Sequence, residues 1–173
     1  MEIRRWKTAM SRPKESPTAR AVVATFPKGR ILDYGCGRGK DVTFYGDRGT
    51  GYDPGPFGYD SPPSGSFEVV VNNFVLNVIE DQAERKTLVE RLKGFLGEGG
   101  RLVLVARATG EINGGAKKGG WEVFGDGYLT GLGTFQKGFS KKELLALGKA
   151  AGLKEAPEKL KLSGCAVVVL QVA

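Results

Sequence analysis

Residues 31–39 decide the fold of this chain; they read Ile-Leu-Asp-Tyr-Gly-Cys-Gly-Arg-Gly. A short apolar run leads directly into glycines at alternate positions, and a helix pattern follows. Side chains at these glycine positions would block a ligand that lies against the backbone, and the turn is expected to need positive φ angles. The stretch therefore predicts a strand, a nucleotide-binding turn and a helix.

The segments around this turn alternate between strand and helix patterns. The apolar runs at 69–71 and 102–105 predict strands that are buried on both faces. Alternation of this kind predicts a doubly wound, Rossmann-like α/β fold with a mainly parallel sheet. We expect strands at 30–34, 50–53, 67–71, 101–106 and 165–172, and helices at 16–26, 41–45, from 81 to about 97, and 140–151.

An acid at the end of the second strand indicates which ligand the turn binds. Asp53 follows Asp33 by 20 residues and is placed to accept hydrogen bonds from ribose hydroxyls. The dinucleotide frame fails because Lys40 stands where its third glycine belongs, and the P-loop frame fails at Asp41. An acid at position 33 is unfavourable beside pyrophosphate and favourable beside a cation, which favours S-adenosylmethionine. A ligand-free tight turn, and a turn role for Asp53 before Pro54, are the alternatives.

At these residues the chain resembles class I S-adenosylmethionine-dependent methyltransferases. Residues 31–39 look like the first motif of that family, Asp53 like its ribose acid, and 67–79 like its fourth-strand motif. The resemblance implies a seven-stranded type of sheet, here reduced, with an antiparallel C-terminal strand. The expected cofactor-binding residues are Asp33, Gly35, Cys36, Gly37, Gly39, Asp53, Pro54, Asn73 and Phe74.

The chain also resembles a narrower group, the methyltransferases associated with DNA phosphorothioation. That resemblance implies a DNA-modification setting without fixing the target. The matching pieces are residues 33–42, 77–81 with 84–85, 134–137 and 139–140.

Composition excludes several kinds of chemistry. The 173 residues contain no histidine and two cysteines, so histidine-dependent triads, imidazole zinc sites and disulfide scaffolds are excluded, and we expect no metal. No apolar run is long enough to cross a bilayer, and the charged N-terminus is unlike a secretory signal. We expect one cytoplasmic domain, residues 1–173, without a membrane partner.

The formal net charge of +7 is unevenly distributed. Residues 1–20 and 112–142 carry the excess of basic side chains, and such segments are typical of proteins that bind a polyanion. We therefore expect a nucleic-acid partner, DNA more than RNA. The alternative is that these segments are basic for solubility alone.

The residues after the third predicted strand are the candidates for catalysis. Asn72 and Asn73 offer amide oxygens that can accept hydrogen bonds from an amine, and Phe74 offers a ring that can stack. Neither cysteine is well placed for a nucleophilic mechanism. The prolines typical of amino-methylases are absent from this stretch. A turn cap at position 73 and core packing at 74 are the alternative.

The glycine-rich stretch near the middle of the chain predicts a flexible substrate loop at 108–138. Ten glycines within 110–138 indicate that it cannot form a regular helix. Residues 1–29 are expected to form a helical cover at the cofactor mouth. A solvated loop without a role is the alternative. The candidate substrate-binding residues are Arg12, Lys14, Lys117, Lys118, Trp121, Gln136 and Lys137, with Phe124 or Tyr128 as further stacking candidates.

These observations predict an S-adenosylmethionine-dependent methyltransferase that acts on nucleic acid, with DNA and an amino nitrogen favoured. The chain is small for a sequence-specific enzyme, so we expect broad specificity or a protein partner for target recognition. A small-molecule or protein methyltransferase is one alternative. A non-catalytic subunit of a modification or phage-defence system that binds cofactor or DNA is the other.

Overall fold

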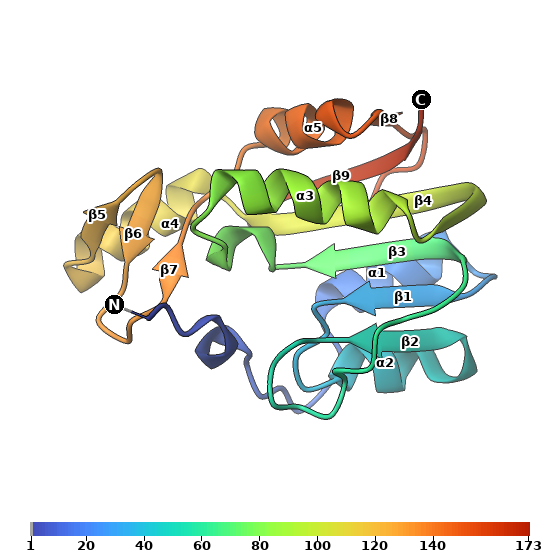
Figure 1. The fold of residues 1–173 in the computed structure, drawn as a ribbon, viewed down its shortest axis with the longest axis horizontal. Helices are drawn as coiled ribbons and strands as arrows, with labels where there is room; N and C mark the ends of the chain where they lie inside the picture. Colours follow the sequence, from blue (N-terminus) through green and yellow to red (C-terminus); the bar gives the residue numbers. More distant parts are fainter. Residues whose placement is uncertain (1) are drawn as a thin grey trace.

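The computed structural model describes residues 2–173 and contains one large sheet with helices on both faces (Figure 1). The strand order is β2-β1-β3-β4-β9-β8, with parallel pairing from β2 to β4 and antiparallel pairing on both sides of β9. The expected Rossmann-like sheet, reduced and with an antiparallel C-terminal strand, is confirmed. The strands are β1 (Ile31–Tyr34), β2 (Gly49–Tyr52), β3 (Phe67–Asn73), β4 (Leu96–Arg107), β8 (Leu153–Glu155) and β9 (Cys165–Val172).

The helices cover the sheet in two layers, each with its own core. Successive strand residues alternate between the layers, as the two-residue period of a strand requires. Leu102 and Leu104 pack with α3 and α5, whereas Val103 and Val105 pack with α1 and α2. Strands buried on both faces are therefore confirmed. The helices are α1 (Pro17–Thr25), α2 (Lys40–Tyr45), α3 (Gln82–Lys93) and α5 (Lys141–Ala150), with 3-10 turns η1 (Arg5–Thr8), η2 (Gly46–Arg48) and η3 (Leu76–Val78).

Side chains cap the N-termini of three of these helices, and at α1 the cap is Ser16, which accepts from the Ala19 amide. Ser140 and Glu143 form a reciprocal capping box at α5. Asp81 caps α3 by accepting a hydrogen bond from the Ala83 amide at 2.7 Å. The reciprocal bond of a capping box is missing at α3, because Glu84 binds Arg5 rather than the cap backbone.

The expectation that 110–138 could not be helical was wrong. Residues Thr109–Gly119 form helix α4, and the chain continues as β5 (Glu122–Phe124), β6 (Gly127–Leu129) and β7 (Phe135–Gln136) in a separate antiparallel sheet. Ile112 and Ala116 lie one turn apart on α4 and are both buried. The Trp121 indole lies where a side chain on Gly119 would otherwise be. Packing of this kind outweighs the poor helix propensity of glycine.

Candidate active site

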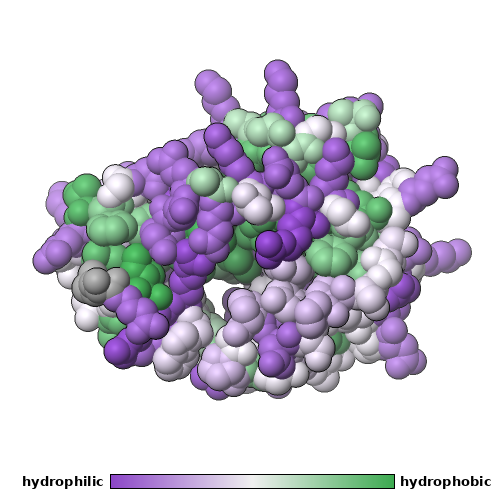
Figure 2. Space-filling view, viewed as in Figure 1, coloured by the Kyte–Doolittle hydropathy of each residue, from purple (hydrophilic) through white to green (hydrophobic). Residues whose placement is uncertain are grey.

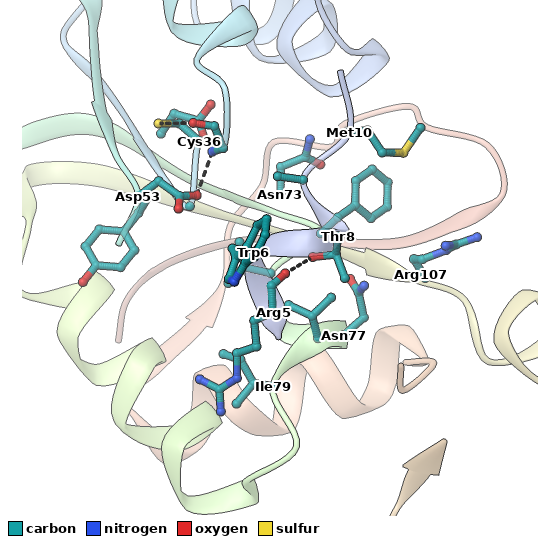
Figure 3. A pocket seen from close by; sticks show the side chains of 18 of the residues that line it. Arg5, Trp6, Thr8, Met10, Cys36, Asp53, Asn73, Asn77, Ile79 and Arg107 are labelled. Carbon is teal, nitrogen blue, oxygen red and sulfur yellow. Dashed lines mark hydrogen bonds between the residues drawn. The ribbon is translucent and has the colours of Figure 1, made fainter. Parts of the chain in front are cut away.

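A cavity of about 760 Å³ opens at the carboxyl ends of β1, β2 and β3. Strand order reverses at β1, because β2 pairs on one side of it and β3 on the other. Ligands of doubly wound sheets bind at such a switch point. Figure 2 shows the hollow on this face, and Figure 3 shows the side chains that line it.

The glycine turn leads from β1 to α2 along one wall of this cavity. The Gly35 and Cys36 amides both donate to the Tyr52 carbonyl, at 2.7 and 3.1 Å. Gly35 has φ of 93°, and a Cβ built on it would overlap the Val75 side chain. Gly39 does not line the cavity. It begins α2 in a left-handed conformation, and its missing side chain leaves room for Tyr59.

Asp53 links the glycine turn to the end of β2. Its Oδ2 accepts a hydrogen bond from the Gly37 amide and its Oδ1 accepts one from the Gly55 amide, both at 2.7 Å. A carboxylate has about four acceptor positions, so both oxygens keep capacity for ligand hydroxyls. Asp53 and Pro54 both line the cavity, in agreement with the expected place of a ribose.

Asp33 lies on β1 beneath the turn and is almost fully buried. Its Oδ1 has no hydrogen-bond partner. Burial, with further contributions from Asp41 and Asp53, raises the pKa of Asp33 to about 8. Because Asp33 lines the cavity, a cation bound there would stabilise its charged form.

Burial also raises the pKa of the Cys36 thiol, with Asp33 and Asp53 adding to the effect. The thiol therefore stays protonated near neutral pH and is a poor nucleophile. The unpartnered acid on β1, the glycine turn and the acid after β2 together fit a nucleoside that carries positive charge.

The two candidate catalytic asparagines are neighbours at the end of β3, but only one of them lines the cavity. Asn72 does not line the cavity; its Nδ2 donates to the Tyr34 carbonyl at 2.7 Å and so ties β3 to β1. Asn73 does line the cavity, and its Oδ1 accepts a hydrogen bond from the Thr18 hydroxyl at 2.9 Å. Phe74 follows with φ of 59°, the one positive φ outside glycine within residues 2–173. Strained backbone of this kind is concentrated at functional sites.

The N-terminal segment, residues 5–12, lies along the cavity and is held at the start of α3 by ion pairs. Arg5 donates to Glu84 at 2.6 and 2.7 Å and to Glu80 at 3.0 Å. The hydrogen bonding of Arg5 to the Glu84 carboxylate is the main cause that raises the pKa of Arg5. Residues 5, 6, 8–10 and 12 of this segment line the cavity, whereas Lys14 does not.

Hydrogen bonds also join the residue before α1 to α2. The Ser16 amide and hydroxyl both donate to Asp41, at 2.7 and 2.6 Å. The N-terminal segment is therefore held by Arg5 at its start and by Ser16 shortly after its end, and it forms one wall of the cavity.

The candidate substrate residues are spread over several places. Gln136 lines the cavity together with Arg12. Lys137 instead pairs with Glu143 at 3.1 Å beside a smaller cavity of about 300 Å³. Lys117 and Lys118 are exposed near the end of α4, and Trp121 packs against that helix; none of the three lines the main cavity.

Sequence reasoning missed several residues that line the cavity. Trp6 and Met10 come from the N-terminal segment, and Asn77 comes from η3. Arg107 and Glu111 form an ion pair at the mouth. Asn77 stands in a stretch that the sequence already marked by resemblance. The other four carry no signal in a single sequence.

Comparison with known proteins agrees with this geometry. A family model described as a methyltransferase domain matches residues 6–155. No curated protein matches the chain in sequence. Among solved structures, the amino pentose methyltransferase CalS10 from Micromonospora echinaspora, with S-adenosylmethionine bound, has a TM-score of 0.63 at 18% identity, covering 98% of this chain and 97% of its own.

Two further solved structures share the fold. DesVI from Streptomyces venezuelae has a TM-score of 0.67 at 17% identity, covering 90% of this chain and 89% of its own. The 1,6-didemethyltoxoflavin-N1-methyltransferase from Burkholderia thailandensis, with S-adenosylhomocysteine bound, has a TM-score of 0.62 at 18% identity, with coverage of 89% and 75%.

Two findings bear on other expected features. Over residues 2–173, no helix is long and apolar enough to cross a membrane. The same residues contain no cluster of three or more side chains suited to a metal ion. With the family match and the site geometry together, the chain belongs to the methyltransferase-domain family and is a methyltransferase that uses S-adenosylmethionine.

Proposed function

We propose that this enzyme methylates a nitrogen atom of a small acceptor molecule that enters the cavity beside the N-terminal segment. The observation that carries the proposal is that Arg5 and Ser16 hold that segment in place as one wall of the cavity. Because the segment closes one side of the cavity, a small molecule fits into it more readily than a base that is still attached to a duplex.

The charges around the cavity support the same proposal. Six basic and five acidic side chains line it, so it has little net charge. Arg5 and Arg107 are paired with glutamates there. Lys117 and Lys118, which the sequence predicted to bind substrate, lie outside the lining residues.

The named activities of similar folds include two that specify nitrogen as the methylated atom and one, a mitomycin 7-O-methyltransferase, that specifies oxygen. One neighbour is an N1-methyltransferase with 1,6-didemethyltoxoflavin bound, one is an amino pentose methyltransferase, and a third is described as a sugar N-methyltransferase. Their identities to this chain are 18% each, so they support the chemistry as an analogy.

The residues of the chain have separate tasks in this reaction. S-adenosylmethionine, when bound, supplies a methyl group on a positively charged sulfur. Asp53, oriented by the Gly37 amide, would hold the ribose, and the carboxylate of Asp33 would balance positive charge. Trp6, Phe74 and Met10 would limit water in the cavity.

No imidazole base is needed for such a transfer. An uncharged nitrogen uses its lone pair to form the new N–C bond while the C–S bond breaks, and the sulfur keeps the electron pair. The nitrogen then releases one proton to water. The products are the N-methylated acceptor, S-adenosylhomocysteine and a proton. Alignment of the two reactants supplies much of the acceleration.

Incubation with radiolabelled S-adenosylmethionine tests the proposal. The panel contains small amines, aromatic amino heterocycles, amino sugars, oligonucleotides and a mixed protein extract. Label transfer to a small nitrogen compound is the expected result, and mass spectrometry identifies the atom. Transfer to oligonucleotides alone would refute the small-acceptor proposal.

DNA is the second candidate acceptor. The excess of basic residues in 1–20, the exposed Lys117 and Lys118, and the resemblance to methyltransferases associated with DNA phosphorothioation support it. On this alternative, a flipped base would enter the cavity, residues 108–138 would contact the strand, and a partner protein would help to select the target. Two results would favour DNA: affinity that falls steeply with salt concentration in the wild type, and a smaller salt dependence in the double variant Lys117→Ala, Lys118→Ala.

A further inference from the structure

Asn77 is a buried polar residue of the cavity to which neither the fold nor the cofactor assigns a task. It lies in η3, directly after the end of β3, with 2% of its surface exposed. Its Nδ2 donates to the Gln136 Oε1 at 3.2 Å, and both residues line the cavity. Its Oδ1 has no hydrogen-bond partner. An acceptor left unpaired in a protein interior is rare and requires an explanation.

In the structure, the Nδ2 end of the Asn77 amide faces Gln136 and the Oδ1 end has no partner. The Lys137 amide donates to the Asn77 carbonyl at 2.8 Å, so β7 and η3 are also joined through the backbone. Because the Nδ2 group is engaged with Gln136, the oxygen is the atom left for a ligand. The site thus offers a hydrogen-bond acceptor and requires a donor from its ligand.

Other unpartnered buried polar atoms in residues 2–173 have different surroundings. Asn72 and Tyr45 do not line the cavity, and Asp33 lies at the cofactor turn. Asn77 is therefore the one unpartnered amide oxygen, among the side chains described, that belongs to a cavity-lining residue.

The environment of Asn77 favours an uncharged, apolar ligand. Val75, Val78 and Ile79 from the same segment line the cavity with Trp6 and Phe74 (Figure 3 labels Asn77, Ile79 and Trp6). A cationic amine needs a free carboxylate when it leaves water. The glutamates of the lining, Glu84 and Glu111, are already paired with arginines.

We propose that the Asn77 Oδ1 accepts a hydrogen bond from the methyl acceptor and selects uncharged aromatic nitrogen heterocycles that carry an amino N–H group. Gln136 acts as a positioning residue, because its Oε1 accepts from the Asn77 Nδ2 and Oδ1 is then the end of the amide without a partner. This inference rests on the proposed function. It adds the class of acceptor and the residue that selects it.

Paired ligands test the inference directly. 2-Aminopyrimidine is compared with 2-(dimethylamino)pyrimidine, and 9-methyladenine with its N6,N6-dimethyl analogue, on protein saturated with S-adenosylhomocysteine. The second member of each pair lacks the amino N–H group and keeps the ring system. Ligand-observed NMR titration measures both dissociation constants. We expect wild type to bind the N–H member about tenfold more tightly, since the analogue leaves the oxygen unpaired.

Substitutions then assign the preference to particular atoms. Asn77→Leu keeps the approximate shape and removes the acceptor, so the preference for the N–H member should disappear. Gln136→Leu should weaken that preference, and Gln136→Glu should retain it because a carboxyl oxygen still accepts from Nδ2. Gln82→Leu is the matched control, since Gln82 is an exposed amide at the start of α3.

The outcomes separate this inference from the proposed function. An equal preference in wild type and Asn77→Leu would overturn the role of Asn77. If S-adenosylhomocysteine binds but neither aminoheterocycle does, the acceptor class is wrong while methyl transfer to another nitrogen compound still stands. Failure to bind S-adenosylhomocysteine at all would overturn the proposed function itself.

Discussion

Asp53→Asn is the sharpest test of the cofactor site, because the substitution changes charge and hydrogen bonding with little change in shape. In the wild type, two backbone amides donate to the carboxylate at 2.7 Å. The asparagine oxygen can accept from one of them, while its NH₂ group faces the other. One amide therefore loses its partner, and the ribose loses a charged acceptor.

The two losses have different sizes. An unpaired amide in this half-buried turn should lower the free energy of unfolding by about 1 kcal/mol. Hydrogen bonds to charged groups contribute about 1.5–3 kcal/mol each, so affinity for S-adenosylhomocysteine should fall roughly 10- to 150-fold. Urea unfolding without ligand measures the first effect, and titration calorimetry measures the second.

Asp60→Asn provides the control, because Asp60 is an exposed acid in the same region of the chain and is absent from the cavity lining. Its affinity for S-adenosylhomocysteine should match that of the wild type. If Asp53→Asn binds within twofold of this control, the ribose role of Asp53 is wrong.

Four further substitutions test other parts of the structure. The pKa of Asp33, raised to about 8 by burial, lies above its value of about 4 in an unfolded chain, so its contribution to stability is present below about pH 4 and is lost as pH rises through 8. Asp33→Asn should therefore reduce the fall in the free energy of unfolding between pH 5 and 9, as urea unfolding measures it. An unchanged fall would contradict the raised pKa of Asp33. Gly35→Ala should destabilise by about 1–3 kcal/mol through positive φ and overlap, as thermal unfolding would show. Arg5→Ala should release S-adenosylhomocysteine several-fold faster in stopped flow, and high salt should reproduce part of the change in the wild type. Trp121→Ala should speed amide hydrogen exchange in 109–119, whereas unchanged exchange would show that the indole does not stabilise α4.

The sheet and the cofactor turn were predictable because local signals agree there. Gly35 follows an apolar strand, and Asp53 ends the next one, so pattern and chemistry lead to the same fold. The apolar runs of β3 and β4 likewise predict burial on two faces. β8 was missed because Leu153–Glu155 contains three residues, with one buried.

The middle of the chain was mispredicted because tertiary contacts override propensity there. Glycine disfavours a helix, yet Ile112, Ala116 and Trp121 stabilise α4 through packing. The wall of the cavity was also hidden from sequence reasoning. Arg5 and Glu84 are separated by 79 positions, and no periodicity links two such residues.

The long-range contacts that hold the N-terminal segment in place have a consequence for the order of folding. Besides the Arg5 contacts, the Arg4 amide donates to the Gly133 carbonyl at 3.1 Å, which closes a loop over most of the chain. Contacts between such distant positions have a high entropic cost, and they form after local structure has reduced that cost. During refolding, the sheet should therefore bury its apolar strands first, and competence to bind ligand should be the last property to return.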